Sequence, residues 1–272
     1  MKHAAKKKWV LRLSRTSVTV AGAFLLSLFV FGFVLLIPFI TEQLEPDDVP
    51  EKVLGERGVQ RSVWVVFHDR EVLTGIVKLV SDTRAMTMCA IGYPPQTEII
   101  DGVTVTTAAA LYLDNGEQVA ALIEELPVLS ISISGAAALM GRLSGNLPMT
   151  LSQAVGELPT GTLTLTPLQA AAVLKFDDWE QGGVGQAWAH ARLTATFLNR
   201  TLTDTLDLDM AFGRLTAVCD SKLNVSQLET VRDDLVTLGA VNDGAICEAR
   251  VVPGYMTGTK EKKRYVCTDK KG

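Results

Sequence analysis

The polar side chains best suited to chemistry lie in the second half of the chain. Lys175 precedes a short acidic run that begins at Asp177, and Gln186 is followed four residues later by His190. A lysine and a histidine can both contact a phosphate group. For Lys175, an ordinary solvated lysine at a helix end is as plausible as a phosphate contact. For His190, an ordinary helix histidine is the favoured interpretation over a phosphate contact. The acidic run could hold a cation, but we favour an exposed acidic loop because no third ligand position is evident.

Other catalytic patterns are missing from the sequence. The chain has three histidines, His3, His68 and His190, so a cluster of histidine ligands is excluded and His68-Asp69 is interpreted as a turn at a strand end. No Gly-x-Ser-x-Gly, phosphate-loop or dinucleotide motif occurs. No catalytic residue follows from a motif; Lys175 and His190 remain candidates, and no metal site is predicted from the residues alone.

The cysteines leave two interpretations open. Cys89, Cys219, Cys247 and Cys267 have neither a C-x-x-C motif nor metal-ligand spacing. Cys247 and Cys267 flank a predicted C-terminal hairpin. A disulfide across that hairpin and a pair of buried free thiols are both compatible with this spacing.

The elements that must position these residues follow from apolar periodicity and turn signals. Strands are predicted over 59–67, 72–80, 85–91, 128–133, 149–151, 246–252 and 264–268. Helices are predicted over 135–143, 186–202, 205–221 and 226–238, with two more between Thr106 and Pro127 that Asn115-Gly116 separates. Thr166-Pro167-Leu168-Gln169 is a capping box that begins another helix. Strands at both ends with helices between predict an α/β fold with a mixed central sheet and helices on both faces.

An uncharged apolar run, residues 17–40, precedes all of these elements. A helix of roughly 20 apolar residues crosses a bilayer, and the run exceeds that length. A cleaved signal peptide and a buried core helix are the alternatives, but the former has a shorter apolar region and a small-residue cleavage site. Six basic residues precede the run and acidic residues follow it, so we predict a single-pass cell-membrane protein with a cytoplasmic N-terminus.

The domain organisation follows from that span. We predict a cytoplasmic basic arm at 1–16, a transmembrane helix at 17–40, a linker at 41–58 and an extracytoplasmic domain at 59–272. Of 26 basic and 30 acidic residues, six basic ones precede the span, which leaves 20 basic against 30 acidic and a formal charge of −10 for the outer part. This balance disfavours a nucleic acid partner, because binding phosphates requires a basic face.

Four stretches of the outer part, taken in order, resemble the LytR-CpsA-Psr family of cell-wall glycopolymer transferases. They are VKLVSDTRAMTMCAIGYPPQT, LMGRLSGNLPMTL, GTLTLTPLQAAAVLKFDD and VVPGYMTGTKEKKRYVCTD. The likeness spans about 59–269 and implies the family's α/β fold. It also implies a polyprenyl-phosphate-linked glycopolymer as ligand, with peptidoglycan or wall-assembly proteins as partners. In the family, arginines and a magnesium ion held by aspartates neutralise the phosphates.

This chain departs from the family at most of those positions. Pro95 and Gln96 occupy the places of an arginine and a metal-binding aspartate, and Lys175 and Asp177 occupy the places of two arginines. Lysine holds a phosphate as a point charge and lacks the planar fork of arginine. By resemblance, Gln96, Lys175, Asp177, Gln186 and His190 are the expected ligand-binding residues, with Mg²⁺ only if the family's chemistry is retained. We expect a non-catalytic binder in envelope assembly. The alternative is a divergent but active phosphotransferase that attaches glycopolymers to peptidoglycan.

Overall fold

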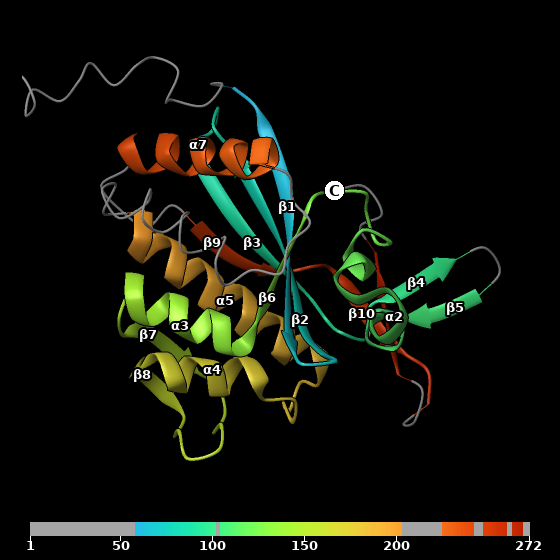
Figure 1. Ribbon diagram of the computed structural model, residues 1–272. Coiled ribbons are helices and arrows are strands. Elements are labelled where there is room, and N and C mark those ends of the chain that lie inside the picture. The colour runs from blue at the N-terminus through green and yellow to red at the C-terminus, as the bar shows by residue number, and fades with distance from the viewer. Residues whose placement is uncertain (1–57, 102–103, 203–224, 242–246, 260–262, 269–272) are drawn as a thin grey trace, which may run out of the picture. The chain divides into compact units, whose positions relative to one another are not determined.

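A computed structural model of the chain describes residues 58–101, 104–202, 225–241, 247–259 and 263–268 (Figure 1). All of them belong to Val53–Gly272, the second of the two units into which the chain divides. Within these ranges no helix has the length and apolar character to span a bilayer. The predicted span at 17–40 and the predicted helix at 205–221 lie outside the described residues and stay predictions.

A five-stranded mixed sheet forms the centre of this unit, with the strand order β6-β1-β2-β3-β9. β1 and β2 pair in antiparallel fashion, as do β2 and β3, whereas β6 joins β1 and β9 joins β3 in parallel. These strands are β1 (Gln60–Asp69), β2 (Val72–Asp82), β3 (Thr87–Tyr93), β6 (Val128–Ser132) and β9 (Cys247–Val251). The sequence predicted each of these five strands.

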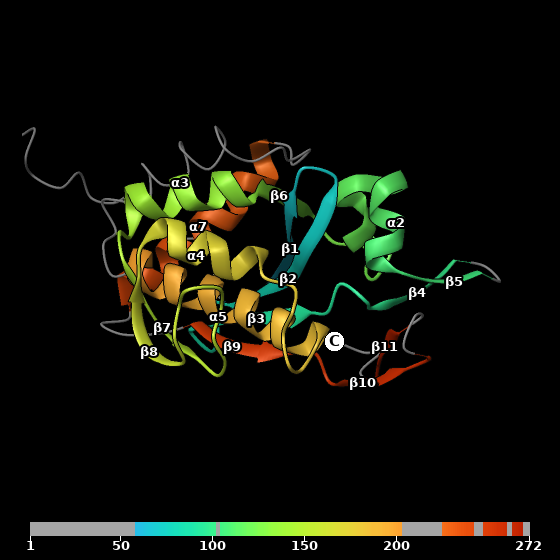
Figure 2. The same ribbon diagram turned by 90° about the horizontal axis from the view of Figure 1, so that it is seen from below.

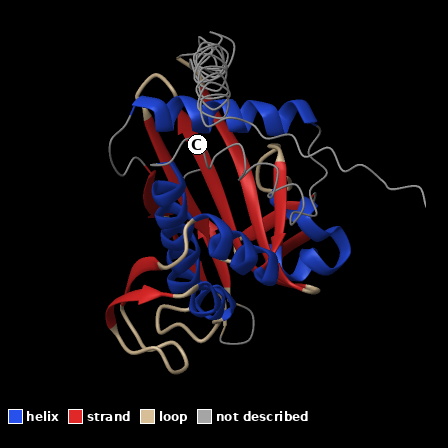
Figure 3. Ribbon diagram, turned by 60° about the vertical axis from the view of Figure 1, so that its left-hand side comes forward, coloured by secondary structure: helices blue, strands red, loops and turns tan. Residues whose placement is uncertain are grey.

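Helices cover both faces of this sheet, as predicted, because its strands are apolar on both sides (Figures 1 and 3). Along β1, Val65 and Phe67 enter one buried cluster, and Trp64 and Val66 enter the other. This alternation is the two-residue period of a strand whose two faces are both buried. The first cluster holds side chains of α3 (Ile133–Leu143), α4 (Pro167–Lys175), α5 (Gly183–Leu202) and α7 (Val225–Val241). The second holds side chains of α2 (Ala108–Asn115) and η1 (Gly116–Ala120).

The capping box predicted at α4 is present. The Thr166 hydroxyl accepts a hydrogen bond from the backbone N–H of Gln169, and the Gln169 side chain accepts one from the N–H of Thr166. Two backbone donors at the helix start are thereby satisfied. This fixes where α4 begins, and its nine residues then place Lys175 at its last position.

The predicted second helix after Asn115 is wrong: only the 3₁₀ turn η1 forms there. Contacts with the sheet explain the difference. The carbonyl of Glu124 accepts a hydrogen bond from Trp64 Nε1, and its carboxylate pairs with the buried Lys78 at 2.5 Å. These contacts hold the segment after η1 over the sheet, and tertiary contacts of this kind override a local helix preference.

Three two-stranded ribbons flank the sheet, and most of their strands were not predicted. They pair β4 (Glu98–Asp101) with β5 (Thr104–Thr107), β7 (Leu147–Leu151) with β8 (Gly161–Leu165), and β10 (Gly254–Thr257) with β11 (Arg264–Cys267). A C-terminal hairpin is present, but the predicted strand at 246–252 is not part of it. That strand is β9 of the central sheet, and β10 pairs with β11 instead.

Candidate functional site

The predicted site residues lie around the end of β1 and the first half of α5. Lys175, the last residue of α4, forms an ion pair with Asp69, the last residue of β1, with 2.5 Å between Nζ and Oδ2. The Lys175 side chain is 63% exposed and that of Asp69 is 34% exposed. The lysine predicted to hold a phosphate is thus already paired with a carboxylate.

This pairing alters the acidity of Asp69. The hydrogen bond from Lys175 lowers the pKa of the Asp69 carboxyl below its ordinary value, more than partial burial raises it. The carboxylate is consequently ionised across the physiological range and offsets the lysine's charge. Asp69 was interpreted from the sequence as part of a turn, and no local pattern could have linked it to Lys175.

His190 is completely buried on the side of α5 that faces β1 and β2. Its ring packs edge-on against Phe67, with 5.2 Å between ring centroids, and lies directly on Gly75 of β2. A Cβ atom at Gly75 would lie 2.5 Å from His190 Nε2, closer than non-bonded atoms approach. Glycine at position 75 is therefore what admits the imidazole.

The hydrogen bonding of His190 fixes where its proton sits. Nδ1 lies 2.9 Å from the carbonyl oxygen of Gln186, which can only accept, so Nδ1 carries the proton and donates it. Nε2 is then a bare acceptor, buried and without a partner in the described part of the chain. Burial lowers the pKa of His190 to about 4, so the ring is neutral at physiological pH. A neutral imidazole can accept a hydrogen bond but brings no positive charge to a phosphate.

Gln96 lies in a turn that backbone hydrogen bonds hold from several sides. Thr97 N–H donates to the Pro94 carbonyl, Ala109 N–H donates to the Pro95 carbonyl, and Tyr265 N–H donates to the Gln96 carbonyl. The Gln96 side chain points at Gly183, the first residue of α5, where a Cβ atom would collide with its oxygen. That oxygen is buried and finds no partner within the described ranges.

A row of polar side chains on α5 was only partly foreseen. Gln186, His190 and Thr194 are spaced four residues apart and are all at least nine-tenths buried, and this spacing places them on one side of the helix. Like His190 Nε2, the hydroxyls of Thr194 and of Thr74 on β2 have no hydrogen-bond partner among the described residues. The four-residue repeat was readable from the sequence, and Thr194 could have been added on that signal. Thr74 had no such signal.

The remaining predicted ligand, Asp177, is exposed in the loop after α4. The structure thus brings Lys175 to Asp69, His190 to Gln186 and Gln96 to the start of α5, and it leaves Asp177 at the surface. The predicted residues offer one paired cation, Lys175, and several neutral hydrogen-bonding groups, and the neighbouring Arg70 adds a second positive charge that acts on Asp69. This arrangement can orient a polar ligand by hydrogen bonds.

The residues present do not fit a magnesium ion. The described part of the chain contains no group of three or more His, Cys, Asp or Glu side chains arranged to hold a metal. Asp69 is neutralised by Lys175, and Gln96 supplies only one neutral oxygen. Magnesium is held by carboxylates together with substrate phosphates, so we derive no metal-dependent step.

Cys247 and Cys267 are free thiols, so the disulfide alternative is not realised. Cys247 lies in β9 of the central sheet, and Cys267 lies opposite Gly254 in the separate β10–β11 ribbon. Cys247 is therefore not on the strand that pairs with the strand of Cys267, which removes the geometric basis for a disulfide across the hairpin. Burial raises the pKa of Cys247 to about 12 and that of Cys267 to about 11, so both thiols stay protonated.

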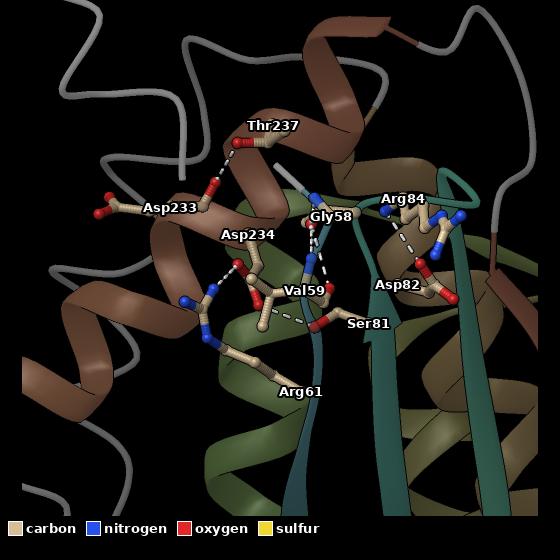
Figure 4. Close-up of polar contacts among 10 residues, drawn as sticks. Gly58, Val59, Arg61, Ser81, Asp82, Arg84, Asp233, Asp234 and Thr237 are labelled. Carbon is tan, nitrogen blue, oxygen red and sulfur yellow. Dashed lines mark hydrogen bonds and ion pairs between the residues drawn. The ribbon is translucent and has the colours of Figure 1, made fainter. Parts of the chain in front are cut away.

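A second polar cluster lies at the other end of β1 (Figure 4). Asp234 of α7 is 2% exposed; it pairs with Arg61 at 2.5 Å and accepts a hydrogen bond of 2.8 Å from the Ser81 hydroxyl. The cluster joins α7 to β1 and β2 across more than 150 residues of sequence. Its carboxylate is satisfied by these partners, so we assign it a structural role.

The central mixed sheet with helices on both faces is the fold of the LytR-CpsA-Psr family, as the resemblance in the sequence implied. A LytR-Csp2A-Psr enzyme from Actinomyces oris superposes with a TM-score of 0.59 at 11% identity, over 77% of this chain and 86% of that one. TagV from Bacillus subtilis superposes with a TM-score of 0.58 at 10% identity, over 78% of this chain and 91% of that one.

A solved structure described as a transcriptional regulator, from Enterococcus faecalis, gives a TM-score of 0.61 at 12% identity, over 76% of this chain and 81% of that one. No protein-family model and no curated protein matches the sequence. At such identities the comparisons define the fold, and function has to be argued from the site.

Proposed function

We propose that this protein is a membrane-anchored, extracytoplasmic component of cell-envelope assembly that binds a polyprenyl-phosphate-linked glycopolymer or a wall-assembly partner without catalysing transfer. The fold supports envelope assembly, since a LytR-Csp2A-Psr enzyme shares it. The uncharged run at 17–40 and the basic residues before it support the anchor. The anchor would bring the outer domain to the membrane leaflet in which a prenyl-linked ligand resides.

One observation carries the non-catalytic part of this proposal: Lys175, the cation predicted to hold the phosphate, is already paired. Lys175 bonds Asp69, while Pro95 and Gln96 stand where the family has an arginine and an aspartate. A transferase must stabilise the charge that develops on a transferring phosphoryl group. The neutral His190 and Gln186 favour orientation of a polar headgroup over that task.

Nucleic acid binding, which the description of the Enterococcus faecalis structure would suggest, receives no support from the charge of this chain. Residues 41–272 carry 20 basic and 30 acidic side chains. A phosphate backbone would be repelled by that excess of negative charge. The proposed ligand carries its phosphate on an apolar lipid instead.

The test uses the purified full chain in mild detergent with Mg²⁺ and a prenyl-pyrophosphate-linked disaccharide. We expect a bound-lipid mass in native mass spectrometry and no release of the prenyl monophosphate that cleavage of the pyrophosphate bond would leave. Lys175→Met is compared with Asp177→Asn, which removes a nearby exposed charge. Release of prenyl monophosphate that disappears in Lys175→Met alone would support the active phosphotransferase instead, and a ligand-free mass would contradict lipid binding.

A further inference from the structure

Large apolar side chains are exposed mainly at one end of the described unit. Of the eight such residues in the described part, five belong to α2, the β4–β5 ribbon and β10: Ile100, Val105, Leu113, Tyr255 and Met256. Single exposed apolar residues are ordinary on a protein surface. Several on neighbouring elements indicate a surface that contacts something apolar.

The β4–β5 ribbon presents one pair of exposed apolar residues. Ile100 of β4 lies directly opposite Val105 of β5, with the two side chains 56% and 43% exposed. Ile99, the preceding residue, is 3% exposed in the core, so Ile100 points away from the core by the alternation of a strand. The ribbon extends outward beyond α2 (Figures 1 and 2).

The β10–β11 ribbon lies beside β4. Arg264 of β11 pairs with Glu98 of β4 at 3.2 Å, and Thr97 forms a bridge with Tyr265. Figure 2 shows both ribbons on the same side of the unit. Met256 of β10 lies opposite the buried Tyr265, so it shares the core-facing side of its ribbon, and Tyr255 points outward. We call the outward-facing residues of these two ribbons the ribbon surface and define it by Ile100, Val105, Tyr255 and Lys263.

Charge changes sign along the sequence in the stretch that supplies β10 and β11, although Arg264 of that stretch is paired with Glu98 of β4. From Tyr255 onward the sequence carries six basic residues against two acidic ones, a formal +4, whereas residues 41–272 as a whole carry −10. Lys263 is exposed beside β11. Aliphatic and tyrosine side chains next to cations are the combination that binds the interface of an anionic bilayer, where apolar groups enter the headgroup region and lysines contact phosphates.

We propose that the ribbon surface docks on the anionic bilayer that holds the protein. This inference rests on the membrane location in the proposed function but concerns a second contact, separate from the span. The 17 residues from 41 to 57 reach at most about 60 Å when extended, so the unit cannot leave the neighbourhood of the membrane. Docking would fix which face of the unit is turned toward the lipid.

The test measures amide hydrogen exchange of the full chain in nanodiscs of phosphatidylcholine with and without phosphatidylglycerol. Peptides covering 98–107 and 254–257 should exchange about fivefold more slowly in the anionic discs. Fivefold is the gain in membrane binding expected from one cation near an anionic bilayer. Lys263→Glu should reduce this protection, and Ile100→Asp with Val105→Asp should abolish it. Leu168→Asp is the matched control, because Leu168 is 79% exposed on α4, away from both ribbons.

Two results would overturn the proposal. One is equal exchange of these peptides in both kinds of disc. The other is protection that depends on protein concentration and not on lipid, which would assign the surface to a second copy of the chain. If the chain does not enter nanodiscs, the span is contradicted, and the same exchange comparison is made with vesicles of the two compositions. Failure of the anchor and failure of the docking surface are therefore distinguished.

Discussion

The imidazole of His190 rests on the backbone of Gly75, so that helix α5 approaches β2 more closely than any side chain at position 75 would permit. Gly92 on β3 admits the same helix at Ala187, where a Cβ atom would collide with the backbone carbonyl. Two glycines on neighbouring strands thus determine how closely α5 packs against the sheet. This close packing buries the row of polar side chains that begins at Gln186.

Gly75→Ala should therefore destabilise the protein. The added methyl group meets a ring that is itself fully buried, and overpacking of this kind costs about 1–3 kcal/mol. The measurement is the free energy of unfolding in urea. Gly141→Ala is the control, because a Cβ atom there meets Pro167 at an ordinary 3.5 Å and alanine favours a helix. Equal stability of the two variants would contradict the close packing.

The burial of His190 predicts a pH dependence of stability. Its folded pKa of about 4 lies below the ordinary 6.5, so between these values the unfolded state binds more protons than the folded state. Stability should be fully present above pH 6.5 and should fall as the pH drops toward 4, by on the order of 3 kcal/mol. Urea unfolding at several pH values checks this. His190→Gln should flatten the dependence, and an unchanged slope would show that another group titrates.

Asp234 should contribute far more to stability than its neighbour Asp233 (Figure 4). Asp234→Ala leaves the Ser81 hydroxyl and the Arg61 guanidinium without their buried carboxylate, and we expect a loss of about 2–4 kcal/mol. The Asp233 side chain is more exposed and its carboxylate pairs with the adjacent Arg232, so Asp233→Ala should change stability by less than about 0.5 kcal/mol. Thermal and urea unfolding measure both, and similar losses would refute the assignment.

Lys175→Met should raise the pKa of Asp69 toward its ordinary value, because the lysine's hydrogen bond is the main cause of the lowering. A lowered folded pKa contributes stability above the unfolded pKa and loses it as the pH falls through the folded pKa. The difference between wild type and Lys175→Met should thus disappear in strongly acidic solution. Carbon-detected NMR titration of Asp69 is the direct measurement, with Asp177→Asn expected to leave the titration unchanged.

What the sequence could predict was local. The central strands followed from β-branched residues between turns, and α4 followed from the Thr166–Gln169 capping box, which the structure confirms. The pairing of Lys175 with Asp69 could not be predicted, because 106 residues separate them and no local sequence pattern links the two. The position of β9 was missed for the same reason, because an apolar strand near a hairpin does not reveal which distant edge it will join.

The parallel pairing of β3 with β9 has a consequence for how the protein reaches its native state. Met88 pairs with Cys247, 159 residues later in the chain, so the last strand of the sheet is made long after the first three. Contacts between such distant residues slow folding, because a long loop must close before any of them forms. A growing chain would hold β3 as an open edge until the residues of β9 have been synthesised.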